Sequence, residues 1–279
     1  ALSASSLDAQ DTAVGGNVAR FGGGVSAEAS SALSLLRFAT SGNEAALVVA
    51  PPPGVASVQL GSGVQGLGAD LYLVGGSSAE VRASVLSGGA ATWAGVAYVG
   101  EASLSGWQVT LANGTASARG GLVYAGAGAE VVLRAPCVLS GGVAADGGAL
   151  YADADPGTAS VALQGCEVRN CSARTGSGGC ARVGVGVQLT SNGTRLVGCA
   201  SPVGQGGGVL VAGGRWTSEG DAVTSSTSSA GGGVAATSGA VVQARALTLA
   251  GNLAPLGLGG ALFADSGASV ELAASAVEG

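Results

Sequence analysis

The 279-residue sequence contains no lysine, histidine, methionine or isoleucine. Without histidine, the chain lacks the side chain that most often acts as a catalytic base or metal ligand near neutral pH. Charged residues make up 10% of the sequence, well below the share of about 25% that is usual in globular proteins. Together these absences are typical of a very GC-rich coding sequence, such as that of a green alga.

Aromatic residues are also scarce, at 4%, although 47% of the residues are apolar. Since small side chains dominate, we expect a thin, long core rather than a globular interior filled with rings. The eleven arginines are dispersed and the formal net charge is −6, which argues against nucleic acid as a partner. No window of about 18 residues is free of charge and of Gly/Ser punctuation, so no membrane insertion by this segment is expected. The start at Ala1 and the repeat pattern at both ends predict a stretch of a longer protein.

Glycine, in contrast, is abundant, and its doublets and triplets recur at a nearly constant interval. The second glycine of each cluster precedes an apolar stretch, with successive gaps of 27, 26, 27, 31, 29, 25 and 27 residues, at Gly68, Gly95, Gly121, Gly148, Gly179, Gly208, Gly233 and Gly260. A fixed period of this length indicates an array whose units bury their apolar faces only by stacking on one another.

Each repeat contains three short runs typical of strands. In one copy, the apolar stretch Gly147–Ala152 is followed by the turn Asp153–Gly157 and the alternating run Ser160–Leu163. Period-2 alternation between small turn residues favours strands over helices. The pattern therefore predicts an all-β fold, a single parallel β-helix with about 27 residues and three short strands per coil. Glycine doublets would supply positive φ and close backbone approach at the corners.

The N-terminal part is less regular. Gly22–Val25 resembles a coil start, but the gap from Gly24 to Gly68 is 44 residues. We therefore divide the β-helix segment 1–279 into irregular first coils at 1–67, with a proline-rich loop near 50–54, and regular coils at 68–279. Proline cannot donate to a sheet ladder, so we expect that loop to leave the β-helix and to offer a contact site.

Two motifs recur with the glycine period. Gly-Gly-Ala-Leu occurs at Gly147–Leu150 and Gly259–Leu262, and an apolar residue three positions before Asn occurs at Val14–Asn17 and Leu249–Asn252. This pairing resembles the repeat of the polymorphic outer membrane protein family, GGA[ILV] with FxxN, within the larger pectin-lyase-like set. Phe of the second motif is replaced here by Val or Leu. The resemblance implies a right-handed β-helix in a surface or secreted protein with an adhesive or scaffolding role.

The five cysteines follow the same period. Cys137 and Cys166 are 29 residues apart, and Cys171 and Cys199 are 28 apart. Positions one coil apart lie about 4.8 Å from each other, within the usual Cα separation of a disulfide. Two bridges between neighbouring coils, Cys137–Cys166 and Cys171–Cys199, are thus candidates, with Cys180 as a buried free thiol. The alternative is a ladder of reduced, buried cysteines.

Three Asn-x-Ser/Thr sequons make Asn192, Asn113 and Asn170 candidates for glycosylation. Asn192 is the best of them because Asn-Gly is typical of an exposed turn, whereas Asn170 could instead point into a corner. Sequons and oxidisable cysteines together predict a secreted or cell-surface location.

No catalytic, cofactor-binding or metal-binding residues are predicted. The carboxylates fall mostly in turns and in separate coils, at Asp70, Asp146, Asp153, Asp155, Asp221 and Asp265. Only Asp153 and Asp155, with Asp146, form a tight acidic group, for which a solvated turn is favoured over calcium. The three tryptophans are expected to pack at rims or in loops rather than to stack on sugars, at Trp93, Trp107 and Trp216.

These observations predict a non-enzymatic structural module of a large extracellular or cell-surface glycoprotein, for example of an algal wall or a ciliary appendage. Its partners would be other protein chains of a larger assembly. A carbohydrate-binding adhesin, with glycans as partners, is the first alternative, and a polysaccharide lyase-like enzyme is the second. No cofactor is expected.

Overall fold

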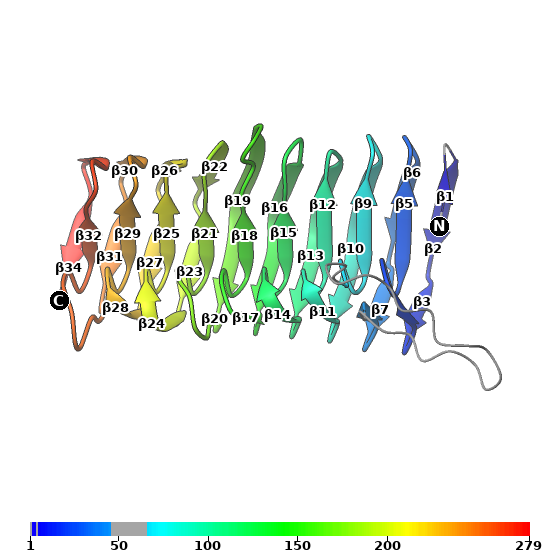
Figure 1. Ribbon diagram of the computed structural model, residues 1–279, viewed down its shortest axis with the longest axis horizontal. Helices are drawn as coiled ribbons and strands as arrows, with labels where there is room; N and C mark the ends of the chain where they lie inside the picture. The colour runs from blue at the N-terminus through cyan, green and yellow to red at the C-terminus, as the bar shows by residue number, and fades with distance from the viewer. Residues whose placement is uncertain (1, 4, 46–65) are drawn as a thin grey trace.

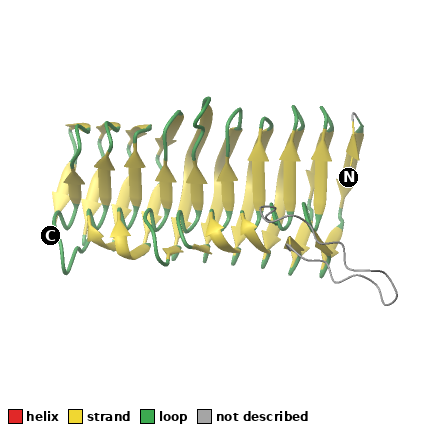
Figure 2. Ribbon diagram, viewed as in Figure 1, coloured by secondary structure: helices red, strands yellow, loops and turns green. Residues whose placement is uncertain are grey.

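The computed structural model describes residues 2–3, 5–45 and 66–279 and shows an elongated parallel β-solenoid with the two termini at opposite ends (Figure 1). Within these residues the regular structure consists of strands, with no helix (Figure 2). Each strand pairs in parallel with the equivalent strand one coil away. The predicted all-β class, parallel stacking and three-sided coil are therefore confirmed. The proline-rich segment near 50–54 lies outside the described residues.

The first sheet follows the glycine clusters and has ten strands, β1 (Leu2–Ser3), β5 (Val25–Glu28), β9 (Leu71–Val74), β12 (Ala97–Gly100), β15 (Val123–Ala125), β18 (Leu150–Ala152), β21 (Ala181–Val183), β25 (Val209–Ala212), β29 (Val234–Thr237) and β32 (Leu262–Ala264). The third sheet precedes the clusters and has eight strands, β4 (Val18–Ala19), β8 (Glu44–Ala45), β11 (Ala90–Trp93), β14 (Thr115–Arg119), β17 (Val143–Ala144), β20 (Ser172–Ala173), β24 (Ala200–Gln205) and β28 (Thr227–Ala230).

The second sheet has sixteen strands because several of its coils contribute two. Ten form its main path, β2 (Ser6–Gln10), β6 (Ala32–Leu36), β10 (Ser78–Ser87), β13 (Ser103–Ala112), β16 (Glu130–Ser140), β19 (Ala159–Arg169), β22 (Val187–Asn192), β26 (Arg215–Glu219), β30 (Val241–Arg245) and β33 (Ser269–Ala273). Six shorter strands continue these, β3 (Ala13–Gly15), β7 (Ala39–Ser41), β23 (Arg195–Val197), β27 (Ala222–Thr224), β31 (Thr248–Ala250) and β34 (Ala276–Glu278).

The core is one continuous stack of small inward side chains. Along the first sheet, Val123, Leu150, Ala181 and Val209 are register partners and are all buried. Because each coil presents few apolar atoms, burial depends on the coils above and below, as in other solenoids. The expectation of a thin, long core is confirmed.

Glycine doublets form the corner before most strands of the first sheet, for example at Gly147 and Gly148 before β18. Gly147 has a φ of 63°, a conformation that glycine adopts without a steric penalty. At Gly148, an added Cβ would lie 2.2 Å from the carbonyl oxygen of Gly179 in the next coil. The first glycine therefore makes the turn, and the second lets the coils approach. Both roles match the prediction.

The register corrects the sequence alignment by one residue in three coils. Positions equivalent to Gly148 are occupied by Ala69, Gly207 and Gly232, rather than by Gly68, Gly208 and Gly233. In a glycine triplet, spacing alone does not tell which glycine makes the close approach.

Within residues 5–45, the first coils stack in register with one another and with the coils that follow. Strand β2 pairs in register with β6, and β6 pairs with β10. Val25 of β5 is the direct partner of Leu71 of β9, although 46 residues separate them. The excess length is therefore confined to the interval between Ala45 and Gly66, and the coils on either side stack directly.

Candidate functional site

One disulfide joins neighbouring coils in the second sheet. Cys137 of β16 and Cys166 of β19 are register partners, with their Cα atoms 4.8 Å apart. This is the bridge that the 29-residue spacing suggested.

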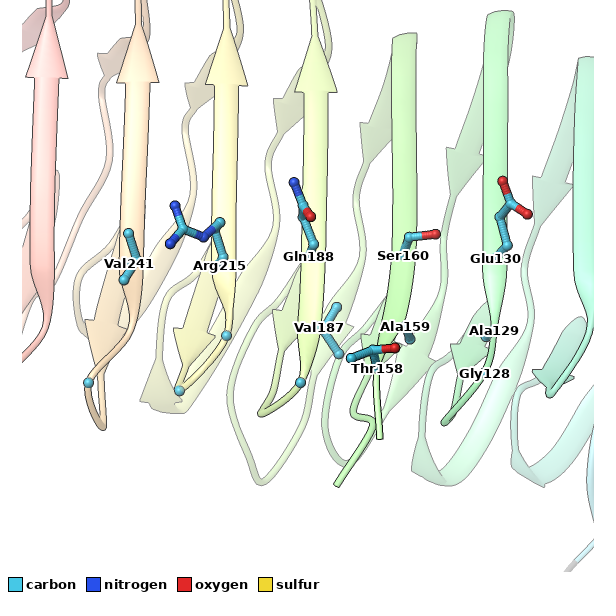
Figure 3. A pocket seen from close by; sticks show the side chains of 14 residues that line it. Gly128, Ala129, Glu130, Thr158, Ala159, Ser160, Val187, Gln188, Arg215 and Val241 are labelled. Carbon is cyan, nitrogen blue, oxygen red and sulfur yellow. The ribbon is translucent and has the colours of Figure 1, made fainter. Parts of the chain in front are cut away.

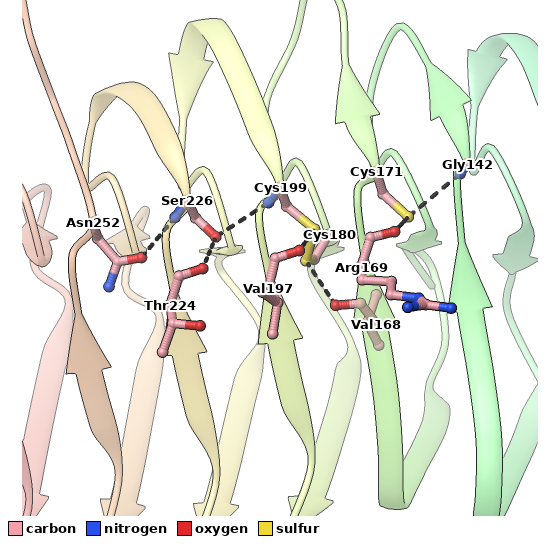
Figure 4. Close-up of a disulfide and its surroundings, with 10 residues drawn as sticks. All are labelled: Gly142, Val168, Arg169, Cys171, Cys180, Val197, Cys199, Thr224, Ser226 and Asn252. Carbon is pink, nitrogen blue, oxygen red and sulfur yellow. Dashed lines mark hydrogen bonds between the residues drawn. A yellow bond between two sulfur atoms is a disulfide. The ribbon is translucent and has the colours of Figure 1, made fainter.

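The second disulfide differs from the predicted one. Cys199 is bonded to Cys180, with a Cα–Cα distance of 5.4 Å, while Cys171 is a buried free cysteine (Figure 4). The prediction of a Cys171–Cys199 bridge with a free Cys180 is therefore wrong. Spacing identifies residues at equivalent positions of successive coils, whereas Cys180 and Cys199 belong to one coil and face each other across its interior.

Cys180 precedes a strand of the first sheet, and Cys199 precedes a strand of the third sheet in the same coil. In other coils the space between these two positions is filled by one large side chain, which comes from either position. An added Cβ at Gly142 would lie 2.7 Å from Leu122 of the same coil, and one at Gly114 would lie 2.9 Å from Val96. In a later coil the order is reversed, since the Asn252 side chain would lie 2.9 Å from a Cβ at Gly233. Cys180 and Cys199 fill the same space with a disulfide in place of one large residue and one glycine. We call these facing positions the corner pair.

The asparagine of the recurring motif is one of the large members of a corner pair. Asn252 accepts a hydrogen bond from the backbone N–H of Ser226 and donates one to the carbonyl of Val223, both in the preceding coil. Other coils use different side chains: Cys171 Sγ accepts from Gly142 N, 3.4 Å away. The motif can therefore lose its asparagine while the corner keeps a hydrogen-bond acceptor.

All three sequon asparagines are exposed. Asn113 and Asn170 occupy equivalent outer corners with φ of 54° and 53°, a left-handed conformation that asparagine tolerates better than most residues. Asn170 therefore does not point into the interior, and its left-handed corner gives it a structural role independent of any glycan. Asn192 ends β22, and the hydroxyl of Thr194 in its sequon is buried and donates to Leu163 O. Glycosylation remains a prediction.

The turn carboxylates do not converge. Asp146 accepts from Arg182, with 3.0 Å between Nη1 and Oδ2, and from the backbone N–H of Ser177. Asp153 accepts a hydrogen bond from the Tyr151 hydroxyl, 3.2 Å away, while Asp155 is exposed. Across the described ranges, no group of three or more potential metal-ligating side chains is close enough to hold an ion.

Two other aspartates are buried inside the solenoid. Asp221 accepts hydrogen bonds from the hydroxyls of Ser191 and Ser218 and from the backbone N–H of Thr194. Trp216 donates its indole N–H to Ser191 Oγ, 2.7 Å away. Burial raises the pKa of the Asp221 carboxyl, and these hydrogen bonds oppose the shift. Sequence reasoning placed Asp221 among the scattered turn carboxylates and missed this network, which is buried inside the solenoid and offers no route for a substrate.

The carboxylate of Asp70 has fewer hydrogen-bond partners than that of Asp221. Its Oδ1 accepts from the side-chain amide of Asn43 at 2.8 Å, whereas its buried Oδ2 has no hydrogen-bond partner. Burial raises the pKa of the Asp70 carboxyl to about 6, a shift that the Asn43 bond reduces. Asp70 is the large member of a corner pair with Gly89.

An aromatic ladder covers the outer face of the first sheet. Its rings stack one per coil, with centroids 5.0–5.5 Å apart, in the order Phe21, Tyr72, Tyr98, Tyr124 and Tyr151. The tyrosines are register partners, spaced 26, 26 and 27 residues apart in the sequence. That spacing was available to sequence reasoning, which considered the tryptophans instead.

The side chains of Arg119 and Trp93 also cover part of the ladder. Arg119 lies over the rings of both Tyr151 and Trp93, and Trp93 contacts Tyr124, with 4.9 Å between centroids. Because the rings stack on each other and on guanidinium groups, few ring faces remain free for stacking on a sugar. Trp107 is exposed on another face, while Trp216 is fully buried in the core. The expectation of rim packing is thus wrong for Trp216.

The outer surface of the described residues has several hollows, of which two bear on binding. One is a cleft of about 340 Å³ beside the ladder, lined by Tyr98, Tyr124, Glu101, Asp153 and Asp155 among others. The larger, of about 640 Å³, is a groove at the corner where the second sheet begins. Four outward side chains, Glu130, Ser160, Gln188 and Arg215, lie side by side along it on successive coils (Figure 3). The groove therefore follows the long axis and suits an extended ligand better than a small one.

No helix that could span a bilayer is found in the described part of the chain. No protein-family model matches the sequence, and no match is found among curated proteins or among solved structures.

Proposed function

We propose that this chain is a non-enzymatic structural module of a large extracellular or cell-surface glycoprotein, where it assembles with other protein chains. The observation that carries the proposal is the continuity of the backbone ladder, since three sheets run through the coils and tie them into one stiff body. The resemblance to the polymorphic outer membrane protein repeat supports the same assignment, as an adhesive or scaffolding surface protein.

The use of the polar side chains supports a structural role. Asp221 and Asp70 lie in the interior, Asp146 is paired with Arg182, and the tyrosines stack on one another. A glycosidase or lyase needs carboxylates, or a carboxylate and a base, converging on one accessible site. In the described residues, Asp70, Asp146 and Asp221 are used in packing, and the carboxylates of Glu101, Asp153 and Asp155 line an open cleft in a chain that has no lysine or histidine to act beside them.

The disulfides support the location. Structural disulfides persist in oxidising compartments and are rare in the cytosol. Cys137–Cys166 and Cys180–Cys199 are both buried, which suits bridges that form once during folding. An extracellular or surface site, in an algal wall or a ciliary appendage for example, agrees with them.

A surface-labelling experiment tests this proposal. Antibodies raised against the purified chain should label intact cells of the source organism as strongly as permeabilised ones, and the chain should co-purify with cell-surface assemblies after chemical cross-linking. Labelling that requires permeabilisation, or release of unsaturated product from polyuronate by the purified chain, would contradict the structural proposal.

A carbohydrate-binding adhesin is the second candidate, favoured by the axial groove. Glu130, Ser160, Gln188 and Arg215 present polar groups at a repeated spacing, as an extended glycan would require. On a glycan array, selective binding that is lost in Arg215→Ala and Gln188→Ala, but kept in the exposed control Arg245→Ala, would favour the adhesin. Absence of selective binding favours the scaffold alone.

A further inference from the structure

Three cysteines meet at one corner of the solenoid. Cys171 and Cys199 occupy the same position in successive coils, because Ser172 and Ala200 that follow them are register partners. Ala200 N donates to the carbonyl of Cys171 at 2.9 Å, which fixes the two backbones side by side. Cys180 faces Cys199 within its own coil, and all three cysteines are buried (Figure 4).

Cys199 therefore has two cysteines beside it, and the Cys171 thiol, which now accepts from Gly142 N on the opposite side, has to rotate about χ1 to meet Cys199. The present partner of Cys199 is Cys180, and Cys171 lies one coil away, at the strand spacing of about 4.8 Å, which is inside the Cα range of a disulfide. The same molecule already contains a bridge of that second kind, since Cys137 and Cys166 are register partners one coil apart with a Cα–Cα distance of 4.8 Å. The geometry of a Cys171–Cys199 bridge is thus realised elsewhere in this fold.

We propose that Cys171 exchanges with the Cys180–Cys199 disulfide, so that the cross-link alternates between one that closes a single coil and one that joins two coils. The Cys171 thiolate attacks Sγ of Cys199, the Cys199–Cys180 bond breaks, and Cys180 leaves as a thiolate that takes up the proton lost by Cys171. No oxidant or reductant is consumed. The inference goes beyond the proposed structural function and does not depend on it.

The interior controls the rate of this exchange. Only the thiolate attacks a disulfide, and burial raises the pKa of the Cys171 thiol to about 11. Exchange is therefore slow while the corner stays closed. Local opening of the coils, or tension along the solenoid, would solvate the thiol and let the cross-link move to the inter-coil position. The corner then gains a covalent tie along the axis of the rod.

The first test uses the full chain with Cys180→Ser. After oxidation, digestion without reduction and mass spectrometry should find a Cys171–Cys199 bridge, with the free thiol of the wild-type protein lost. Cys171→Ser is the matched control, which should keep Cys180–Cys199 and also contain no free thiol. Free Cys171 and Cys199 in a folded Cys180→Ser protein would overturn the proposal.

The second test needs no variant and covers the case in which Cys180→Ser does not fold. Wild-type protein is held at pH 8.5 in urea just below its unfolding midpoint, so that coils open locally without global unfolding, quenched with acid at intervals, and alkylated after denaturation. The label should sit on Cys171 at first and then spread to Cys180, while Cys199 stays unlabelled because it is bonded in both forms. Label confined to Cys171 throughout would overturn the proposal, and so would label reaching Cys199, which indicates general scrambling.

Discussion

At the scale of single residues, the stacking of coils depends on the absence of a Cβ at some positions and on buried polar groups at others. Gly148 admits the carbonyl of the next coil to a place where a Cβ would stand. Asp70 buries a carboxylate of which only Oδ1 has a hydrogen-bond partner, while Oδ2 has none. The first feature allows stacking, and the second weakens it in a way that depends on pH.

Gly148→Ala should lower the stability of the protein by about 1–3 kcal/mol, the usual range for overpacking a tight interior. The matched control is Gly260→Ala, at the equivalent position of the last described coil, where the nearest atom to an added Cβ is Asn252 O at 3.2 Å. Urea unfolding followed by circular dichroism should show a shifted midpoint for the first variant and little change for the second. Equal effects would mean that the approach of the next coil is not the cause.

Asp70 should make stability fall as pH rises from about 4 to about 6. Burial raises its pKa from 3.8 to about 6 in the folded protein, so the folded state binds the proton more tightly than the unfolded chain does. The stabilisation is complete below the unfolded pKa and is lost as pH rises through the folded pKa. From a shift of this size the change is on the order of 2–3 kcal/mol.

Asp70→Asn should remove this pH dependence and raise the stability at pH 7 relative to the wild-type protein. Asp8→Asn, at an exposed position, is the control and should leave the pH profile unchanged. Thermal unfolding at pH 4, 5, 6 and 7 provides the comparison. A profile that keeps its slope in Asp70→Asn would assign the pH dependence to another group.

At the scale of elements, the outer face of the first sheet is held by the aromatic ladder. Tyr98 and Tyr124 stack with 5.0 Å between centroids and 6° between planes, and Tyr124 and Tyr151 with 5.5 Å and 7°. Gly100 and Gly126 leave space beside these rings, since an added Cβ at either would lie 3.2 Å from its neighbouring tyrosine. The ladder thus adds a second layer of apolar contact outside a sheet whose interior is filled by small side chains.

Tyr124→Ala should therefore destabilise the protein by about 3–5 kcal/mol, as loss of a large buried ring usually does. Tyr124→Phe is the matched control, because it keeps the ring and removes only the hydroxyl. Denaturant unfolding should place Tyr124→Phe close to the wild-type protein. If the two variants are equally destabilised, the hydroxyl rather than the stacking is responsible.

At the scale of the whole molecule, each coil contacts only its neighbours, so stability is shared along the rod and cooperativity is local. The two disulfides and the free cysteine lie between Cys137 and Cys199, in the middle coils. The terminal coils have a neighbour in this chain on one side only, and residues such as Leu262 and Val270 are less buried than their equivalents further in.

Hydrogen exchange should reveal this gradient. Backbone amides of β16, β19 and β22 should exchange slowest, and those of β33 and β34 fastest, because opening starts at the ends and the cross-linked coils open last. Reduction of both disulfides should accelerate exchange most in β16 and β19. Uniform protection along the chain would instead indicate that the rod opens as one cooperative unit.

The architecture was predictable because its signal is repeated in every coil. Glycine doublets, alternating runs and the 29-residue Cys137–Cys166 spacing each report contacts between equivalent positions, and these were identified. Contacts across the interior of a coil have no such periodic signal, which is why Cys180 was not paired with Cys199. The Asp221 network escaped for a different reason. Its residues do follow the coil period, since Ser191 is the register partner of Ser218 and Thr194 is equivalent to Asp221, but buried serine, threonine and aspartate are the same residue types that fill the turns.

The corner pair also determines how such a repeat can change over evolutionary time. Because only one large side chain fits, a larger residue at Gly142 requires both a smaller residue in place of Leu122 and a shift of the Gly148 carbonyl, which lies 2.4 Å from an added Cβ. Related sequences should therefore show compensating substitutions between positions about 20 residues apart, in addition to similarity at the coil period. A repeat comparison that scores only the coil period would treat these exchanges as noise, although they preserve the volume of the interior.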